Sequence, residues 1–259
     1  MPLEPPWFTA TAAVLAAIAF TFVLAGFVKG VVGLGLPTIS MGLLGLFMAP
    51  AQAATLLIVP SLITNVQQML AGGTLRALLR RLWPMQIAVV LGTLFAPVSL
   101  ATLDTRIAST GLGVALIVYA VLGLAAMRFS VTRNAERWAS PVVGLITGVI
   151  TAATGVFVVP AAPYLQGLGL NKDELVQALG LSFTVSTIAL SLRLAFDGSL
   201  TFSAITAGWG LIMPLLAALA GMALGTALRG KLSEAVFKRV FFAGLLLVGL
   251  HLALKGLMY

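Results

Sequence analysis

Long apolar runs follow one another along almost the whole chain, and only short polar breaks separate them. Of the 259 residues, 60% are apolar and 8% are charged, whereas an ordinary soluble domain carries about 25% charged residues. A water-soluble fold of this size could not hide so much apolar surface from water. The runs exclude soluble globular, disordered, coiled-coil and nucleic-acid-binding classes, and they predict an integral membrane protein in contact with the lipid bilayer.

The length of these runs predicts spanning helices. Each helix needs about 20 apolar residues and each short loop about 5, so the chain has room for about ten segments and no soluble domain. The runs lack the two-residue alternation of an outer-membrane barrel. We predict an all-α integral membrane protein with helices at 8–28, 37–48, 51–71, 84–103, 108–127, 139–152, 157–168, 174–195, 203–226 and 235–255.

Basic residues mark one side of the membrane. Most of them fall in or beside three short polar breaks, and an excess of Lys and Arg in short loops marks the cytoplasmic side. Their expected role is anchoring rather than ligand binding. The chain must cross an even number of times between the second and third breaks, so its short segments there count as crossings and both termini face outward. The clustered residues are Arg76, Arg80, Arg81, Arg128, Arg133, Arg137, Arg229, Lys231, Lys238 and Arg239.

The two halves of the chain resemble each other when one is displaced along the other. We expect a first membrane repeat at 1–130 and a second at 131–259, which together form one transmembrane domain. Each repeat has about five segments. Because this number is odd, the second repeat starts on the opposite side of the membrane and is inverted, an architecture of many secondary transporters. The matched positions are Gly26, Gly30, Gly33 and Pro37 in the first half and Gly144, Gly148, Gly155 and Pro160 in the second.

Each half contains one stretch that cannot continue a straight helix. In the first half, three glycines and a proline fall within residues 29–38, and both residue types break helices. The counterpart is residues 151–155, followed by Pro160. A short helix is expected to start near Pro37, because proline suits the first helical turn. Its free N–H groups would suit a small oxyanion.

Two roles for these glycines and their neighbours follow. Small residues can simply let helices pack closely, and Gly26 and Gly30 fit that role. The other role is to open a binding site at the helix break. The residues assigned to that second role are Gly33, Gly35, Thr151, Thr154 and Gly155.

Lys29 is a single cation within the first apolar run. A lysine inside a membrane span costs about 2.5–3.5 kcal/mol, so it needs a partner or a wet cavity. The seven acidic residues all fall near segment ends, which leaves an anionic substrate as the natural partner. The alternative is that Lys29 ends the first helix and extends to the cytoplasmic headgroups.

The third helix of each half carries a polar stripe. These side chains can line a polar site or hold helices together, and Asn65 corresponds to Thr187 in the repeat. Near the end of the second stripe, Arg193 is predicted either to guard the outer mouth or to anchor the helix at the interface. The stripes are Ser61, Thr64, Asn65 and Gln68, and Gln177, Thr184, Thr187 and Ser191.

Signatures of enzyme chemistry and of cofactors are missing from the sequence. The chain has no cysteine, so thiolate metal sites and cysteine nucleophiles are excluded. It contains no HExxH, P-loop or GxSxG motif and no paired carboxylates at catalytic spacing. We therefore predict no enzyme activity, no cofactor and no metal site.

The helix-break motifs resemble those of a known family. AGFVKGVVGLGLPTISMGLLGLFMAPAQAATLLIVPSLITNVQQ (Ala25–Gln68) and VGLITGVITAATGVFVVPAAPYLQGLGLNKDEL (Val143–Leu175) are similar to the two signatures of the TauE/SafE family of sulfite-exporter-like permeases. The resemblance implies a secondary transporter of sulfite or organosulfonates such as sulfoacetate, with two inverted repeats and a midplane site. The residues that match are Lys29, Gly30, Gly33, Gly35, Pro37 and Asn65.

The second signature departs from the family pattern. Where many members have a glycine-glycine-proline run, this chain reads Gly155-Val156-Phe157-Val158-Val159-Pro160. A more apolar wall would suit a substrate with a carbon part beside its anionic group.

Together these features predict a transporter in the bacterial inner membrane that exports a small sulfur-containing anion by alternating access. Two alternatives stay open, an anion channel of the same fold and a non-transporting membrane assembly partner. Small residues on outward helix faces could support a homodimer. The predicted substrate-binding set is Lys29, Gly33, Gly35, Asn65, Gln68, Thr151, Thr154, Gly155, Thr187 and Arg193.

Overall fold

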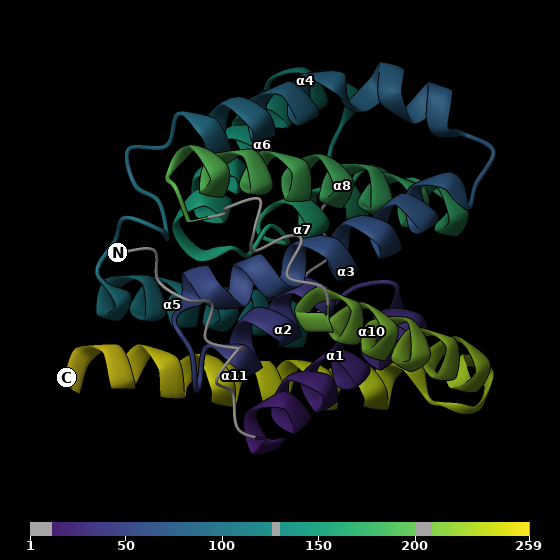
Figure 1. The fold of residues 1–259 in the computed structure, drawn as a ribbon. Coiled ribbons are helices and arrows are strands. Elements are labelled where there is room, and N and C mark those ends of the chain that lie inside the picture. The colour runs from purple at the N-terminus through teal and green to yellow at the C-terminus, as the bar shows by residue number, and fades with distance from the viewer. Residues whose placement is uncertain (1–11, 126–129, 200–208, 259) are drawn as a thin grey trace.

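The computed structural model describes residues 12–125, 130–199 and 209–258, and these residues are helical with short connections (Figure 1). No strand occurs among them, so the all-α prediction is confirmed. The elements are α1 (Ala12–Val32), α2 (Leu36–Leu44), α3 (Pro50–Leu70), α4 (Leu75–Leu94), α5 (Thr105–Leu124), α6 (Arg133–Thr154), α7 (Ala161–Gln166), α8 (Lys172–Phe196), α10 (Trp209–Leu228), η2 (Arg229–Lys231) and α11 (Glu234–Met258).

Six helices in the described part of the chain are long and apolar enough to span a membrane. They lie in α1, α3, α5, α8, the stretch Ile212–Lys231 and the stretch Ala235–Gly256. This confirms the prediction of a multi-pass membrane protein. The short helices α2 and α7 have nine and six residues. At 1.5 Å per residue, each covers half of the apolar core of a bilayer or less.

The bounds of α4 correct one prediction. The helix occupies Leu75–Leu94 instead of 84–103, so the first basic cluster lies in its first two turns rather than in a polar break. Arginine is a good helix former, whereas Pro97 disfavours helical backbone at the residue before it. Hydropathy therefore located an apolar stretch of the chain, but it did not give the bounds of the helix.

The second basic cluster shows the same effect. Arg133 and Arg137 lie in the first turns of α6, which starts six residues before the predicted 139. Arg128 and the predicted helix starts at 8 and 203 lie outside the described residues.

Helix α1 packs along α10 through glycines. A Cβ atom at Gly26 would lie 2.1 Å from the carbonyl oxygen of Ala218, and one at Gly30 would lie 2.4 Å from that of Met222. No side chain fits at such distances, so the two backbones are in direct contact. The close-packing role of Gly26 and Gly30 is confirmed.

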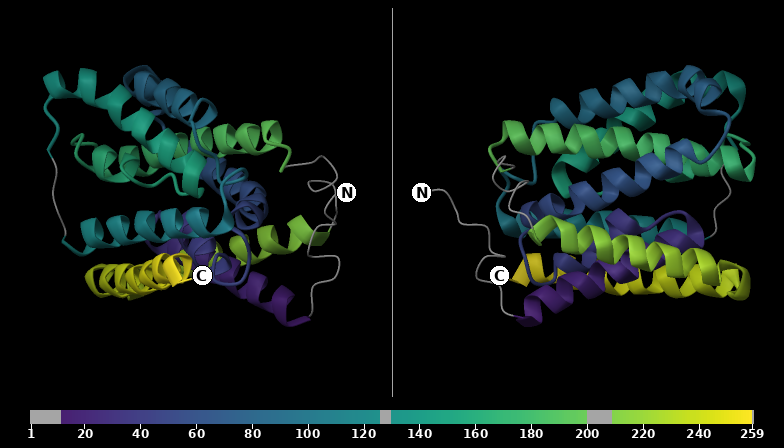
Figure 2. Two further views of the ribbon diagram at one scale, coloured as in Figure 1. Left: turned by 90° about the vertical axis from the view of Figure 1, so that its left-hand side faces the viewer. Right: turned by 45° about the vertical axis from the view of Figure 1, so that its right-hand side comes forward.

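Helix α6 packs along α4 in the same way. A Cβ atom at Gly144 would lie 2.3 Å from the carbonyl oxygen of Met85, and one at Gly148 would lie 2.4 Å from that of Val89. The glycines that matched in the sequence therefore make the same kind of contact in each half. Figures 1 and 2 show the two pairs on opposite sides of the molecule, with α2, α3, α7 and α8 between them.

The central helices of the two halves, α3 and α8, lie against each other. Asn65 is close to Thr187, and Met69 is close to Gly180, so residue numbers rise along one helix as they fall along the other. The two helices are antiparallel, as expected of equivalent helices in inverted repeats. The inversion of the halves in the membrane stays a prediction.

Both predicted helix breaks occur. Helix α1 ends at Val32, and Gly33 and Gly35, with φ of 77° and 107°, lead into α2. Helix α6 ends before Gly155, with φ of 72°, and α7 follows Pro160. Only glycine adopts such angles without strain. α7 is shorter than the predicted 157–168.

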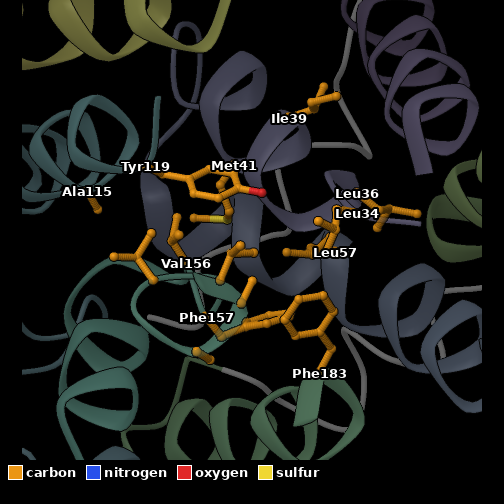
Figure 3. Packing of buried hydrophobic residues seen from close by; sticks show 14 of the residues in the cluster. Leu34, Leu36, Ile39, Met41, Leu57, Ala115, Tyr119, Val156, Phe157 and Phe183 are labelled. Carbon is orange, nitrogen blue, oxygen red and sulfur yellow. The ribbon is translucent and has the colours of Figure 1, made fainter. Parts of the chain in front are cut away.

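The apolar core extends through most helices, and one part of it lies around the two helix breaks. In Figure 3, Met41 of α2 points toward Val156, which belongs to the connection after α6, and Phe157 lies beside Phe183 of α8. The rings of Phe157 and Phe183 have centroids 5.4 Å apart, and both side chains are fully buried. This apolar packing holds the two broken segments together.

Candidate functional site

Lys29 lies inside the protein, one turn before the end of α1. Its side chain is 5% exposed, so it does not extend to the headgroups as the alternative predicted. The ammonium group donates to the hydroxyl of Thr64 at 3.0 Å and to the side-chain carbonyl of Asn65. Both partners belong to α3, so the cation links two helices of the first half.

Asn65 extends this network to α8. Its amide nitrogen donates to the hydroxyl of Ser61 at 2.9 Å and lies 3.4 Å from the hydroxyl of Thr187. The two hydroxyl oxygens are 3.2 Å apart. All three side chains are buried. The network therefore reaches the interface at which the two halves of the chain meet.

The direction of each hydrogen bond is set by local geometry. The hydroxyl of Thr64 donates to the carbonyl oxygen of Pro60 at 2.7 Å, so its lone pairs are free to accept from Lys29. The hydroxyl of Thr187 likewise donates to the carbonyl oxygen of Phe183 at 2.7 Å. Each hydroxyl proton bonds to the backbone of its own helix, one turn earlier, so both hydroxyls act as acceptors toward the network.

The network holds a cation and no carboxylate among the described residues. Of the described acids, Glu136 pairs with Arg81 and Asp197 with Arg193, away from Lys29. An ammonium group has three N–H donors, and two of them are used. A buried charge without a counter-charge is costly. The arrangement can therefore stabilise a small anion, which would supply the missing negative charge and accept the third hydrogen bond.

Gln68 lies beside the first helix break. Its amide nitrogen donates to the carbonyl oxygens of Gly33 at 3.2 Å and Val176 at 3.0 Å, while its side-chain oxygen is buried without a partner. The N–H of Gly33 donates to the carbonyl oxygen of Lys29 at 2.7 Å. Gln68, Gly33 and Lys29 are thus neighbours, and Gly35 follows at the start of α2.

The second helix break is not joined to this network by a hydrogen bond of its predicted side chains. The hydroxyls of Thr151 and Thr154 donate to the carbonyl oxygens of Thr147 and Ile150 within α6, each at 2.7 Å. A Cβ atom at Gly155 would lie 2.8 Å from the terminal carbon of Met41. Gly155 is therefore in close contact with Met41 of α2, and Figure 3 shows Met41 pointing toward the next residue, Val156.

Arg193 lies in the last turn of α8. Its guanidinium group donates to the carbonyl oxygens of Leu94 at 2.7 Å and Ala96 at 3.0 Å, and to the carboxylate of Asp197 at 3.0 Å. Asp197 also accepts from Ser99. These bonds fasten the end of α8 to the end of α4, so the structure separates Arg193 from Lys29.

Some buried polar residues were not predicted as site residues. Their side chains belong to α4, α6 and α8 and have no hydrogen-bond partner. Alignment of the two halves could have identified Ser186, because it precedes Thr187 as Thr64 precedes Asn65. The residues are Gln86, Thr147, Ser182 and Ser186.

The fold and the site define a class of protein. It is a multi-pass membrane protein with a buried cation in a polar network between two broken-helix halves, which is the architecture of a membrane permease. The chain matches the family model for sulfite exporter TauE/SafE over residues 18–252. It belongs to this family, whose members are transporters rather than enzymes. No curated protein and no solved structure showed a significant match to the chain.

Proposed function

We propose that this permease is a secondary transporter that exports small sulfur-containing anions, such as sulfite or organosulfonates, across a bacterial inner membrane. One observation carries the proposal: Lys29 is buried with neutral partners and without a carboxylate. Sulfite and sulfonates present several oxygens around one negative charge. Such a group could pair with the ammonium and accept the hydrogen bond that Lys29 does not use.

The other predicted residues have roles in this proposal. Asn65 orients Lys29 and joins it to Thr187. Gln68, Gly33 and Gly35 form the nearby wall, at which α2 begins. The apolar connection around Phe157 would face the carbon part of a sulfonate. Alternating access would come from movement of one repeat against the other.

The test is counterflow of radiolabelled sulfite and sulfoacetate in proteoliposomes. We expect saturable exchange that Lys29→Met abolishes and Asn65→Ala reduces by about tenfold or more. The matched control is Lys255→Met, because Lys255 is exposed and donates to the carbonyl oxygen of Leu46. Exchange that survives Lys29→Met would contradict the role of this lysine.

The same preparation separates the two alternatives. Ohmic single-channel currents in planar bilayers would indicate an anion channel of the same fold. Neither exchange nor current with a panel of small anions, together with a stoichiometric partner in gentle pull-downs, would indicate an assembly partner.

A further inference from the structure

A cavity of about 480 Å³ lies between α4 and α6, away from Lys29. Three arginines line it: Arg81 from α4, and Arg133 and Arg137 from the first turns of α6. Glu136 is the only acid among its lining residues. The cavity is thus a cationic pocket at the ends of two neighbouring helices.

The three arginines are not equivalent. Arg81 donates to both carboxylate oxygens of Glu136, at 2.7 and 2.8 Å, and to the carbonyl oxygen of Leu168 at 3.2 Å. Its charge is neutralised and its position is fixed. Arg133 and Arg137 are exposed and form no ion pair with any residue that the structure describes. The pocket therefore presents two guanidinium groups that are free to bind an anion.

Beyond the pocket residues, both helices carry exposed apolar side chains. On α4 these are Trp83, Ile87 and Leu91, four residues apart, which are 58%, 51% and 47% exposed. On α6 they include Trp138 and Val142, 65% and 47% exposed. Tryptophan is typical of the level of lipid headgroups. Trp83 and Trp138 are neighbours in sequence of Pro84 and Arg137, which line the pocket, so we expect the pocket at the level of the headgroups.

We propose that this pocket binds the phosphate group of an anionic phospholipid. Arg133 and Arg137 donate to the phosphate oxygens, as guanidinium groups do in bidentate pairs, and Arg81 with Glu136 shapes the wall. The acyl chains lie along the apolar faces of α4 and α6. A free anion would not use these faces, which is why a lipid is the occupant. Basic pockets between membrane helices suit such headgroups.

Trp83 and Trp138 report on the lipid that is bound. In a Trp7→Phe/Trp209→Phe background, they are the remaining tryptophans of the four in the chain. The protein is reconstituted into phosphatidylcholine vesicles that contain a small fraction of one brominated lipid. This lipid is either brominated phosphatidylglycerol or brominated phosphatidylcholine. Quenching by the brominated phosphatidylglycerol is expected to indicate about fivefold enrichment next to these helices.

The pocket arginines are then changed. Arg133→Gln/Arg137→Gln is expected to remove the enrichment, whereas Arg133→Lys/Arg137→Lys keeps at least part of it. The matched control is Arg229→Gln/Lys231→Gln, which removes two exposed basic residues from η2 and is expected to keep the enrichment.

Three results would overturn the proposal. The first is equal quenching by the two brominated lipids in the parent protein. The second is a loss in the control variant as large as that in Arg133→Gln/Arg137→Gln. The third is removal of the enrichment by inorganic phosphate at constant ionic strength, which would assign the pocket to free anions. The readout is independent of transport, so failure of the lipid site is distinguishable from failure of the proposed function.

Discussion

The two halves of the molecule place different chemistry at equivalent positions. Gly30 and Gly148 make matching backbone contacts with α10 and α4, so the residues before them, Lys29 and Thr147, are equivalent. Lys29 is hydrogen-bonded to Thr64 and Asn65. The hydroxyl of Thr147 is buried without a partner.

The partners on the central helices follow the same pattern. Thr64 accepts from Lys29, whereas its equivalent, Ser186, is buried and has no partner. One half therefore holds a hydrogen-bonded cation without a counter-charge, and the other holds, at the equivalent positions, neutral hydroxyl groups that lack hydrogen bonds. The charge thus occurs at only one of the two matched positions, and in the proposed function it would make the site for a small anion asymmetric.

The largest expected effect comes from making the two halves alike. Lys29→Thr gives the first half the residue of the second and removes the charge. We expect at least about a 30-fold loss of counterflow, because truncating one partner of a buried charge interaction costs about 2–5 kcal/mol. Thr147→Lys, added to this variant, returns a charge at the equivalent position and is expected to restore part of the exchange. An unaltered rate in Lys29→Thr would remove the functional difference between the halves.

The glycine contacts of the two halves are expected to contribute equally to stability. Gly30→Ala and Gly148→Ala each force a Cβ atom against backbone, at 2.4 Å, and overpacking of this kind costs about 1–3 kcal/mol. Thermal unfolding in detergent should show a similar loss for both variants. Gly244→Ala is the control, because a Cβ atom there meets nothing within 4 Å. A loss in only one of the two variants would break the structural equivalence.

Substitutions of Asn65 and Thr187, on the central helices α3 and α8, should lower the transport rate by smaller and unequal amounts. Asn65→Leu leaves Lys29 with Thr64 as its remaining hydrogen-bond partner, and we expect about a tenfold lower transport rate or more. Thr187→Val removes one weak acceptor of Asn65 and should cost a few-fold at most. Initial rates at saturating substrate measure both. Equal losses would mean that the second half contributes as much to the site as the first.

The smallest effect is expected from the unpartnered hydroxyls. Ser186→Ala and Thr147→Val remove buried groups without a hydrogen bond, so stability in detergent should stay constant or rise by about 1 kcal/mol. Thr64→Val, which removes a bonded hydroxyl, should lower it by a similar amount. If Ser186→Ala lowered transport instead, the second half would take part in substrate binding.

Local sequence properties were enough for several elements. Gly33, Gly35 and Gly155 predicted the helix breaks, because backbone freedom belongs to the residue itself. The bounds of α4 could not be predicted from apolarity, because its first two turns carry Arg76, Arg80 and Arg81. Helix propensity and Pro97 determined that helix.

The candidate site was predictable only in part. The sequence placed Lys29 and Asn65 at polar positions of apolar helices, and their mutual hydrogen bond depends on the tertiary fold, which brings the end of α1 close to α3. Arg193, Thr151 and Thr154 carried the same kind of sequence signal. The structure instead gives them bonds to the carbonyl oxygens of α4 and α6.

The sequence by itself determined that the chain enters a membrane, where its helices break, and which family it belongs to. These properties follow from the hydropathy of each run, from the backbone freedom of glycine and from local motifs. The tertiary structure alone decided that Lys29 points inward and finds neutral partners, and that Asn65 meets its equivalent, Thr187. Such contacts join residues that are far apart in the chain, so they depend on how the helices pack, and no local pattern specifies them.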